Sequence, residues 1–412
     1  MFKRRIYLDY ASLTPIDPSV LREMKRFSAP KYANPSSLYG EGVNAKKALE
    51  ESRKKVGEFI HGHSDEIVFT SGGTESNGLA LEGVYRAAYV AQDGLRNDIE
   101  KPHLIISAVE HSSVIEYANM MEKHGVEVTR LGVDSCGLIS LDELKKAIKP
   151  NTFLVSIMTV NNEIGNVQPI REIAKVIRRA KEELNRDRLA EGLSPKYPLF
   201  HTDAAQAALY FDLNVEKLGV DLLTLDGSKI YGPRGIGALY VKRGTPIEPI
   251  IYGGGQEKGM RSGTENIPAI AGFAKASELA AADRENEAVR IEGLNRDFLQ
   301  DLLKIRPDIS VNGWSKVSVE DQSFAFATPH ILNVSIPGID NEFFVLQLDA
   351  KGIAVSTKSS CLRDQDESYA LKAIGADSKT SIRFSFGRWT SKSDVRAVLR
   401  RIGALLTLGN FH

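Results

Sequence analysis

The sequence predicts an α/β fold, in which a large domain with a mostly parallel sheet flanked by helices is joined to a smaller α+β domain. From about residue 44 to 270, short β-branched runs alternate with amphipathic helical patterns, which is typical of a parallel sheet with crossover helices. Beyond residue 281 the alternation gives way to charged helical patterns and isolated strands. A chain of 412 residues with 42% hydrophobic content can give each domain a buried core.

The large domain is expected to cover residues 15–260, and its first clear helix covers residues 44–60. Apolar side chains recur on one face of this helix, namely Ala45, Ala48, Leu49, Val56, Phe59 and Ile60. The strands expected after it are Ile67–Thr70, Leu104–Ser107, Phe153–Met158, Leu199–Thr202, Leu222–Leu225 and Ile236–Val241. Several of them end in or just before Ser, Thr, Gly or Asp, and open α/β sheets bind ligands at such carboxyl ends.

The smaller domain is expected to combine residues 1–14 with residues 261–412. A charged helical pattern covers residues 281–304. The elements expected after it are strands over His330–Ile336 and Ser381–Phe386 and helices over Glu342–Leu348 and Ser391–Leu406.

The charge balance and the cysteine content indicate which kinds of ligand and which cellular compartment to expect. Lys plus Arg and Asp plus Glu both number 53, so no net charge favours nucleic acid or an anionic membrane, and a small-molecule substrate is expected. The chain shows no apolar run of signal-peptide or membrane-span length. A cytoplasmic location is therefore expected. The cysteines of the chain, Cys136 and Cys361, are too few for a disulfide framework, and a reducing compartment would leave both as thiols. Cys136 lies in a turn and is interpreted as structural.

A glycine turn between a strand and a helix offers a phosphate site. The segment Ile67-Val-Phe-Thr-Ser-Gly-Gly-Thr-Glu-Ser-Asn77 runs from a strand through a turn into a helix start. Such a turn presents unpaired backbone N–H groups and the positive end of a helix dipole, where a phosphate binds without side-chain charge. Alone, this pattern is more often an ordinary strand-to-helix turn.

Two later strand ends carry groups that suit an aromatic aldehyde cofactor. His201-Thr-Asp-Ala-Ala-Gln206 places Asp203 at the carboxyl edge of the sheet, where a carboxylate can pair with a protonated ring nitrogen. Leu225-Asp-Gly-Ser-Lys-Ile-Tyr-Gly-Pro-Arg-Gly235 places Lys229 after a strand, where a shielded amine can form a Schiff base. Considered separately, Asp203 is more often a helix cap or a solvated acid, and most such lysines are solvated.

Taken in order with further motifs, these segments resemble the cysteine desulfurases of the class V aminotransferase group. The further motifs are Asn34-Pro-Ser-Ser37, Val160-Asn-Asn-Glu-Ile-Gly165 and Gly253-Gly-Gly-Gln-Glu-Lys-Gly-Met-Arg-Ser-Gly-Thr-Glu-Asn266. The resemblance covers the chain from Tyr7 to about Thr390, and several ordered motifs are far more specific than one. It implies a pyridoxal-5'-phosphate (PLP) transferase of fold type I, with a seven-stranded sheet in the large domain.

The resemblance implies a set of cofactor contacts, which divide between the phosphate and the ring. Those at the phosphate come from Gly73, Thr74, Ser228 and Thr264, the last reaching the partner's site across a homodimer. Those at the ring come from His111 stacked on its face, Asn162 and Gln206 near its phenolic oxygen, Asp203 at its nitrogen and Lys229 at its aldehyde. No metal ligand is expected.

The implied substrate is L-cysteine. Arg383, in Ser381-Ile-Arg-Phe-Ser385, matches the family's anchor for the substrate carboxylate, and Asn34 is expected to lie close to that carboxylate. With the substrate held there, the implied reaction releases L-alanine. The catalytic residues implied are Lys229, which moves the substrate α-proton, together with His111 and a cysteine.

The cysteine is Cys361. The segment Lys351-Gly-Ile-Ala-Val-Ser-Thr-Lys-Ser-Ser-Cys361 resembles the loop that carries the family's sulfur-accepting thiol. Lys358 and Arg363 flank Cys361, and nearby positive charge favours the thiolate. The implied product is a persulfide on Cys361, which passes to an acceptor protein in iron–sulfur cluster assembly or tRNA thiolation.

The chain departs from the family at the lysine motif. The family usually has Ser-x-His-Lys where this chain has Asp226-Gly-Ser-Lys229. A carboxylate at about 4 Å from a phosphate would be repelled by roughly 4 kcal/mol at an effective dielectric near 20, so Asp226 is expected to point away. Ser228 brings no positive charge, so a lower affinity for PLP is expected than is usual in the family.

The sequence leaves other functions open. A selenocysteine lyase or another class V PLP lyase would share the cofactor half of the site, although Cys361 favours sulfur transfer. A non-catalytic scaffold with weakened PLP binding is suggested by Asp226 and Ser228, and is opposed by the retention of Lys229 and Arg383. Nucleotide binding is not favoured, because the chain has no GxGxxG or P-loop signature.

Overall fold

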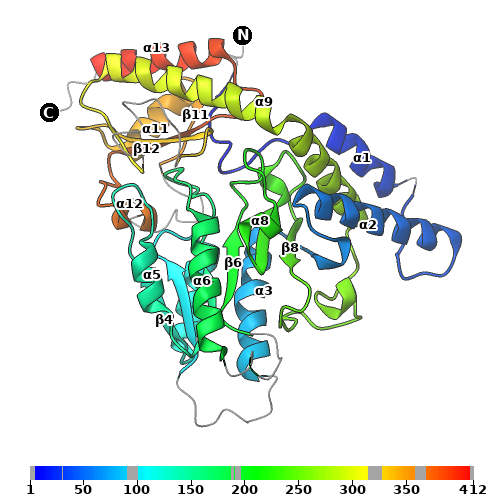
Figure 1. The fold of residues 1–412 in the computed structure, drawn as a ribbon. Helices are drawn as coiled ribbons and strands as arrows, with labels where there is room; N and C mark the ends of the chain where they lie inside the picture. The colour runs from blue at the N-terminus through cyan, green and yellow to red at the C-terminus, as the bar shows by residue number, and fades with distance from the viewer. Residues whose placement is uncertain are drawn as a thin grey trace.

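The computed structural model describes residues 5–29, 31–90, 101–186, 190, 196–313, 327–357 and 368–408. A large sheet with helices around it forms most of the molecule, and smaller sheets lie at one end together with helix α13 (Figure 1). None of the described helices is both long and apolar enough to span a membrane.

The large sheet confirms the expected architecture. Its strands are β2 (Ile67–Thr70), β3 (His103–Ser107), β4 (Glu127–Leu131), β5 (Thr152–Ser156), β6 (Leu199–Asp203), β7 (Leu222–Asp226) and β8 (Gly237–Val241), in the order β2-β8-β7-β6-β5-β3-β4. Strand β8 is antiparallel to both of its neighbours, and the pairs from β7 to β4 are parallel. The sequence does not predict β4, because this edge strand is partly exposed and its residues Glu-Val-Thr-Arg-Leu lack a continuous apolar run.

Both faces of the sheet are buried. Along β3, Leu104 and Ile106 pack into the core that includes residues of α3 (Gly73–Tyr85) and α4 (Ser112–Lys123), whereas Ile105 packs into the core on the opposite face. The remaining elements around the sheet are α1 (Pro18–Ser28), α2 (Gly40–Phe59), α5 (Leu141–Ala147), α6 (Ile170–Leu184), α8 (Val215–Leu218), η1 (Ser64–Glu66), η2 (Arg86–Val90), η3 (Gly227–Lys229) and η4 (Glu257–Gly259).

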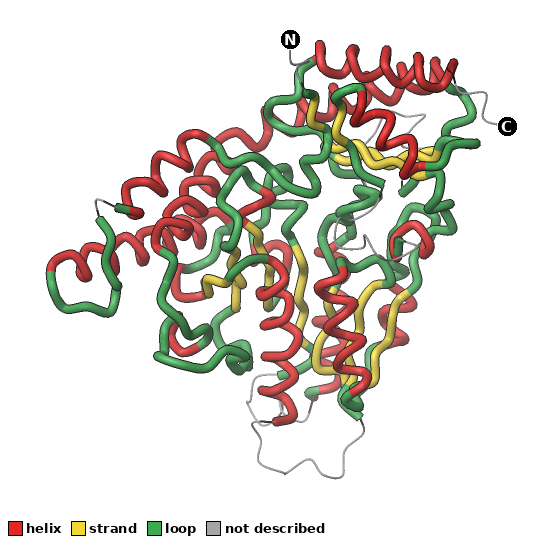
Figure 2. The backbone as a smooth tube through the Cα atoms, turned by 180° about the vertical axis from the view of Figure 1, so that it is seen from behind, coloured by secondary structure: helices red, strands yellow, loops and turns green. Residues whose placement is uncertain are grey.

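The smaller sheets are separate from the large one, as the view from behind shows (Figure 2). Their strands are β1 (Ile6–Tyr7), β9 (Ser310–Val311), β10 (Ile331–Ser335), β11 (Ile353–Ala354) and β12 (Ser381–Ser385). Strand β10 pairs antiparallel with β9 and β12, and β1 pairs in parallel with β11. The helices beside them are α11 (Asn341–Ala350), α12 (Tyr369–Ala373) and α13 (Lys392–Leu408).

Helix α9 (Ile267–Ile305) joins the two parts of the chain. Its 39 residues extend about 58 Å at 1.5 Å per residue, and it packs against α1, α2 and α13. It begins earlier than the predicted charged segment, because its first part is almost entirely apolar and buried and therefore shows no amphipathic pattern. The domain boundaries at residues 14 and 260 stay a prediction, although the β1–β11 pair places the start of the described chain beside the smaller sheets.

Candidate active site

A pocket of ≈ 740 Å³ lies where the carboxyl ends of several parallel strands meet. Strand β6 ends at Asp203 and strand β7 ends at Asp226, and both residues line the pocket. The full lining is Ala11, Ser12, Gly73, Thr74, Asn77, His111, Ser113, Met158, Val160, Asn162, Asp203, Ala205, Gln206, Asp226, Lys229 and Arg383. The structure thus brings together most of the residues that the sequence predicts for the site.

The other expected residues either are not among those that line this pocket or are not described by the structure. Thr264 lines a second pocket, of ≈ 600 Å³, with Arg261 and Glu257. Asn34 is not among the residues that line the main pocket, and its side chain accepts a hydrogen bond from the backbone N–H of Ser36. Cys361 lies outside the described residues, as do Lys358 and Arg363.

Lys229 closes the turn after β7 and points at the N-terminal segment. Its Nζ donates to the carbonyl oxygens of Ala11, at 3.1 Å, and Ser12, at 2.5 Å. Thr14 fixes this arrangement, because its N–H and hydroxyl both donate to the carbonyl of Ser228. The lysine is thereby held at the pocket wall by residues more than two hundred positions earlier in the chain.

Asp203 is buried and its carboxylate is held by Asn77. The Nδ2 of Asn77 donates to Oδ2 of Asp203, and also to the hydroxyl of Ser113, each at 2.8 Å. The same hydroxyl lies 2.8 Å from Nδ1 of His111, which forms the N-cap of α4. Asn77 was not predicted as a site residue, yet it follows Gly73 by one helical turn, and that i, i+4 spacing indicates a shared helix face.

Gln206 connects the pocket to a buried histidine. Its Nε2 donates to the carbonyl oxygen of Ala11, so its Oε1 faces His330 Nε2 at 3.2 Å. Burial lowers the pKa of His330 to about 3, so the ring is neutral near pH 7. Because Oε1 can only accept, His330 donates from Nε2 and its Nδ1 accepts from the hydroxyl of Thr328, at 2.7 Å.

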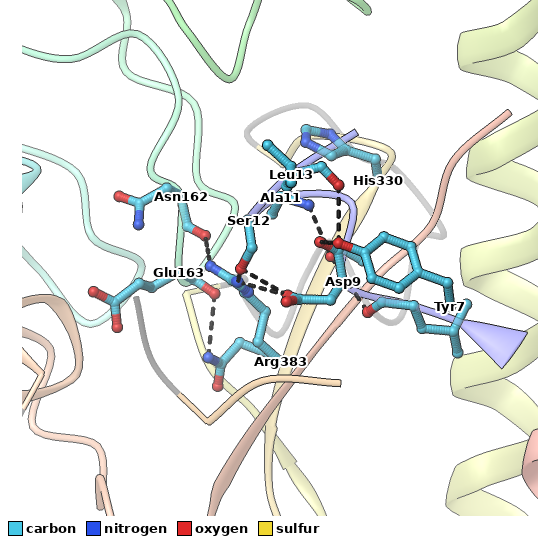
Figure 3. Close-up of polar contacts among 12 residues, drawn as sticks. Tyr7, Asp9, Ala11, Ser12, Leu13, Asn162, Glu163, His330 and Arg383 are labelled. Carbon is cyan, nitrogen blue, oxygen red and sulfur yellow. Dashed lines mark hydrogen bonds and ion pairs between the residues drawn. The ribbon is translucent and has the colours of Figure 1, made fainter. Parts of the chain in front are cut away.

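Arg383 is the most enclosed charged group of the pocket. Its side chain is 1% exposed, and its Nη1 donates to the carbonyl oxygen of Asn162 at 2.7 Å. The Nη2 atom donates to Oδ1 of Asp9, at 2.8 Å, and to the hydroxyl of Ser12, at 2.6 Å (Figure 3). Asp9 was not predicted as a site residue, and no local pattern in the sequence marks it.

Asp226 lines the pocket beside Gly73, which is expected at the cofactor phosphate, so the expectation that Asp226 points away is wrong. Its Oδ2 accepts a hydrogen bond from the backbone N–H of Gly73, at 3.1 Å. Its Oδ1 accepts from the backbone N–H and the hydroxyl of Ser228, at 2.7 and 2.6 Å. The physical reason is that the first N–H groups of α3 have no partner within the helix and attract an anion, and this carboxylate reaches them.

Glu110 lies behind His111 in a fully buried position. Its Oε1 accepts from the hydroxyl of Ser107, at 2.6 Å, and from the backbone N–H of Met158, at 2.9 Å. Burial raises the pKa of Glu110 to about 8, so its carboxyl group is mostly neutral at pH 7. By contrast, Cys136 lies away from the pocket, and burial raises the pKa of its thiol, which keeps it protonated.

The residues of the pocket fit PLP at the ring and differ from the usual pattern at the phosphate. Lys229 offers an amine, Asp203 a buried carboxylate and His111 an aromatic ring, and all three line the same pocket. At the other end, the carboxylate of Asp226 is bound to Gly73 N–H, which is a donor suited to a phosphate oxygen.

The chain is similar to known proteins over nearly its whole length. Residues 6–398 match the model of the aminotransferase class-V family. Cysteine desulfurase IscS of Dictyoglomus turgidum is 40% identical over 402 residues, covering 96% of this chain and 93% of the relative. Cysteine desulfurase IscS 1 of Archaeoglobus fulgidus is 38% identical over 397 residues, covering 95% and 94%.

Solved structures give the same result. A NifS-like protein has a TM-score of 0.85 and 32% identity, and the match covers 98% of this chain and 100% of that one. The structure of SspA in complex with cysteine has a TM-score of 0.73 and 32% identity, with 94% and 100% covered. The chain therefore belongs to the class-V aminotransferase family, among its cysteine desulfurases.

Proposed function

We propose that this chain is a PLP-dependent cysteine desulfurase that converts L-cysteine to L-alanine and passes the sulfur through Cys361 to an acceptor protein. The observation that carries the proposal is the meeting of Lys229, Asp203 and Arg383 in one pocket of a chain whose relatives are cysteine desulfurases. An amine, a buried carboxylate and a buried guanidinium are the groups that would hold an aldehyde cofactor, its ring nitrogen and an amino-acid carboxylate.

When bound, PLP supplies an aldehyde carbon for covalent attachment and an aromatic system that withdraws electrons from the substrate. Lys229 is the point of attachment, and its amine moves the substrate α-proton as a general base. Asp203 keeps a proton on the ring nitrogen, His111 covers the ring face, and Asn162 and Gln206 bind near the phenolic oxygen. These roles are supported by the single pocket that all of these side chains line.

Arg383 binds the substrate carboxylate. Its Nε is buried without a hydrogen-bond partner among the described residues, which leaves a donor for an incoming carboxylate. Asp9 and Ser12 hold Nη2 in place, so the guanidinium is oriented before the substrate arrives. Such a preoriented fork binds a carboxylate with less loss of side-chain entropy than a free arginine would.

Sulfur transfer is assigned to Cys361. Its thiolate attacks the sulfur of the substrate, and the substrate's carbon–sulfur bond breaks with its electron pair left on the carbon side. A proton added at the β-carbon and a proton returned to the α-carbon complete alanine. The products are then alanine and a persulfide on Cys361. Lys358 and Arg363 favour the thiolate by charge. The acceptor is expected in iron–sulfur cluster assembly or tRNA thiolation.

The assembly is proposed to be a homodimer, in which Thr264 reaches the cofactor phosphate of the partner's site. Its support is that Thr264 lies outside the main pocket of its own chain, in a loop that lines a separate pocket. A cytoplasmic location stays a prediction from the sequence.

The test is to measure alanine and sulfide released from L-cysteine by protein loaded with PLP, in the presence of a thiol reductant. Equal release of both products, abolished in Lys229→Ala and in Cys361→Ala, is the expected result. The Cys136→Ala variant serves as a matched control and should keep full release. Turnover of L-selenocysteine that survives in Cys361→Ala, with no turnover of L-cysteine in the parent protein, would instead indicate a selenocysteine lyase.

A further inference from the structure

The N-terminal end of α3 is bound by a side chain of the protein itself. The Oδ2 atom of Asp226 accepts a hydrogen bond there from the N–H of Gly73, while Oδ1 accepts from the N–H and hydroxyl of Ser228 in the turn after β7. We propose that Asp226 takes the place of the cofactor phosphate at this helix end, and so makes the pocket weakly selective for PLP over unphosphorylated pyridoxal. The inference rests on the proposed function, because it concerns the cofactor of the same site.

The close approach of Asp226 to the helix depends on glycine. A Cβ atom added at Gly73 would lie 3.2 Å from Oδ2 of Asp226, which is tighter than an ordinary contact. Gly72 precedes it with a φ of 150°, a conformation that side chains rarely adopt. The turn therefore admits an anion directly against its backbone, and the anion found there is a carboxylate.

Asp226 also holds the turn that carries Lys229. It is the N-cap of η3 (Gly227–Lys229), and its carboxylate satisfies the N–H of Ser228 in that turn. A phosphate that displaced Asp226 would remove this cap from the turn of the attachment lysine. Binding of the phosphorylated cofactor therefore opposes an interaction that positions Lys229.

If Asp226 stays in place, its charge repels the phosphate. Two unit charges at about 4 Å and an effective dielectric near 20 change an equilibrium constant by roughly 10²- to 10³-fold. Ser228 contributes a hydroxyl and no compensating charge. Pyridoxal keeps the aldehyde for Lys229 and the ring nitrogen for Asp203, and it brings no phosphate to this end of the pocket.

The experiment compares binding of PLP and of pyridoxal to the cofactor-free full-length protein, by absorbance and fluorescence titration. Lys229→Ala identifies the part of the signal that depends on the lysine. The variants are Asp226→Ser, which removes the carboxylate and leaves Gly73 N–H available, and Asp226→Asn, which removes only the charge and keeps the side-chain shape. Glu75→Gln is the control, since it removes another acid from the first turn of α3 that does not line the pocket.

We expect the parent protein to bind the two aldehydes with dissociation constants within about tenfold of each other. In Asp226→Ser and Asp226→Asn the affinity for PLP should rise by roughly 10²-fold or more, and that for pyridoxal by less than about threefold. Glu75→Gln should behave as the parent.

Two other outcomes are decisive. If the parent binds PLP at least about 10³-fold more tightly than pyridoxal, and Asp226→Asn does not strengthen PLP binding, the inference is wrong and the proposed function stands. If no protein with Lys229 binds either aldehyde, the proposed function fails and the inference fails with it.

Discussion

Arg383 and Asp9 form an ion pair across 374 positions of sequence, with Nη2 of the arginine 2.8 Å from Oδ1 of the aspartate. Asp9 follows β1, and Arg383 lies in the centre of β12, so the pair ties the start of the chain to the smaller antiparallel sheet (Figure 3). The guanidinium is almost completely buried. The pair therefore serves both the stability of the fold and the orientation of the substrate anchor.

Replacing Arg383 by methionine separates these two roles. The variant leaves Asp9 without its cation, so we expect a loss of roughly 3–5 kcal/mol in the free energy of unfolding. Loss of the substrate anchor should also raise KM for L-cysteine by about 10²-fold, the effect of a charge-assisted hydrogen bond. Denaturant unfolding and steady-state kinetics measure the two quantities.

The double variant Asp9→Asn with Arg383→Met provides the control. Because it removes both charges, it should recover much of the stability, while KM stays high. Recovery of KM together with stability would mean that Arg383 acts only through the fold and does not bind the substrate.

Asn77 should matter to the cofactor because it holds Asp203. In Asn77→Ala the carboxylate of Asp203 loses the donor to Oδ2, and a hydrogen bond to a charged group is worth about 1.5–3 kcal/mol. We expect affinity for PLP to fall by about tenfold or more in an absorbance titration. Ser76→Ala is the matched control, since Ser76 is buried in the same helix and bonds to Thr70 instead of the pocket. Equal weakening in both variants would show a general effect of α3 and not a specific role of Asn77.

The elements that the sequence predicts are those with a local pattern. Strand Ile67–Thr70 is predicted with its exact bounds, because its apolar run ends at a glycine turn. The edge strand β4 and the first third of α9 are missed, because partial exposure in one and nearly complete burial in the other remove the periodicity. The local hydrophobic pattern thus reflects how a segment is buried. It indicates secondary structure only where burial is confined to one side of the segment.

The residues of the site also differ in whether a local sequence pattern reveals them. Lys229, Asp203 and Arg383 lie in recognisable motifs, whereas Asp9 and Asn77 act through contacts that only the folded chain creates. The direction of Asp226 is missed for a related reason. A phosphate would repel the carboxylate of Asp226, but the backbone N–H of Gly73 at the start of α3 attracts the same carboxylate. The second interaction involves residues that are distant in the sequence, so the sequence does not reveal it.

The raised pKa of Glu110 predicts that the protein loses stability as the pH rises from about 4.5 to about 8. Its pKa is raised from 4.5 in the unfolded chain to about 8 in the fold, so the folded state holds the extra proton between these values. The stabilisation is fully present below about pH 4.5, decreases as the pH rises, and is lost through about pH 8. In Glu110→Gln, which is neutral at every pH, urea unfolding between pH 5 and 8 should show a flatter decline than in the parent. The exposed Glu285→Gln variant should follow the parent, and identical slopes for Glu110→Gln and the parent would rule out a neutral Glu110.

The lowered pKa of His201 predicts the opposite dependence, in which the protein loses stability as the pH falls. It lies in the middle of the large sheet, where its Nδ1 is 2.8 Å from the hydroxyl of Ser156 and its Nε2 is 3.0 Å from that of Thr224. Burial lowers the pKa of His201 from 6.5 to about 3. The unfolded chain therefore takes up a proton first, so the stabilisation is present above about pH 6.5 and is lost as the pH falls through about 3.

Replacing His201 by glutamine tests this dependence, because glutamine keeps a donor and an acceptor but cannot be protonated. The variant should be less stable than the parent at pH 7, since its amide cannot match both hydroxyl contacts. Between pH 6 and 4, however, the stability of the parent should approach that of the variant, with a difference in slope of up to about 1.4 kcal/mol per pH unit. The exposed His124→Gln variant is the control and should leave the difference from the parent constant. A parent and His201→Gln variant that lose stability in parallel on acidification would show that His201 is protonated in the folded state, and that the sheet accommodates its charge.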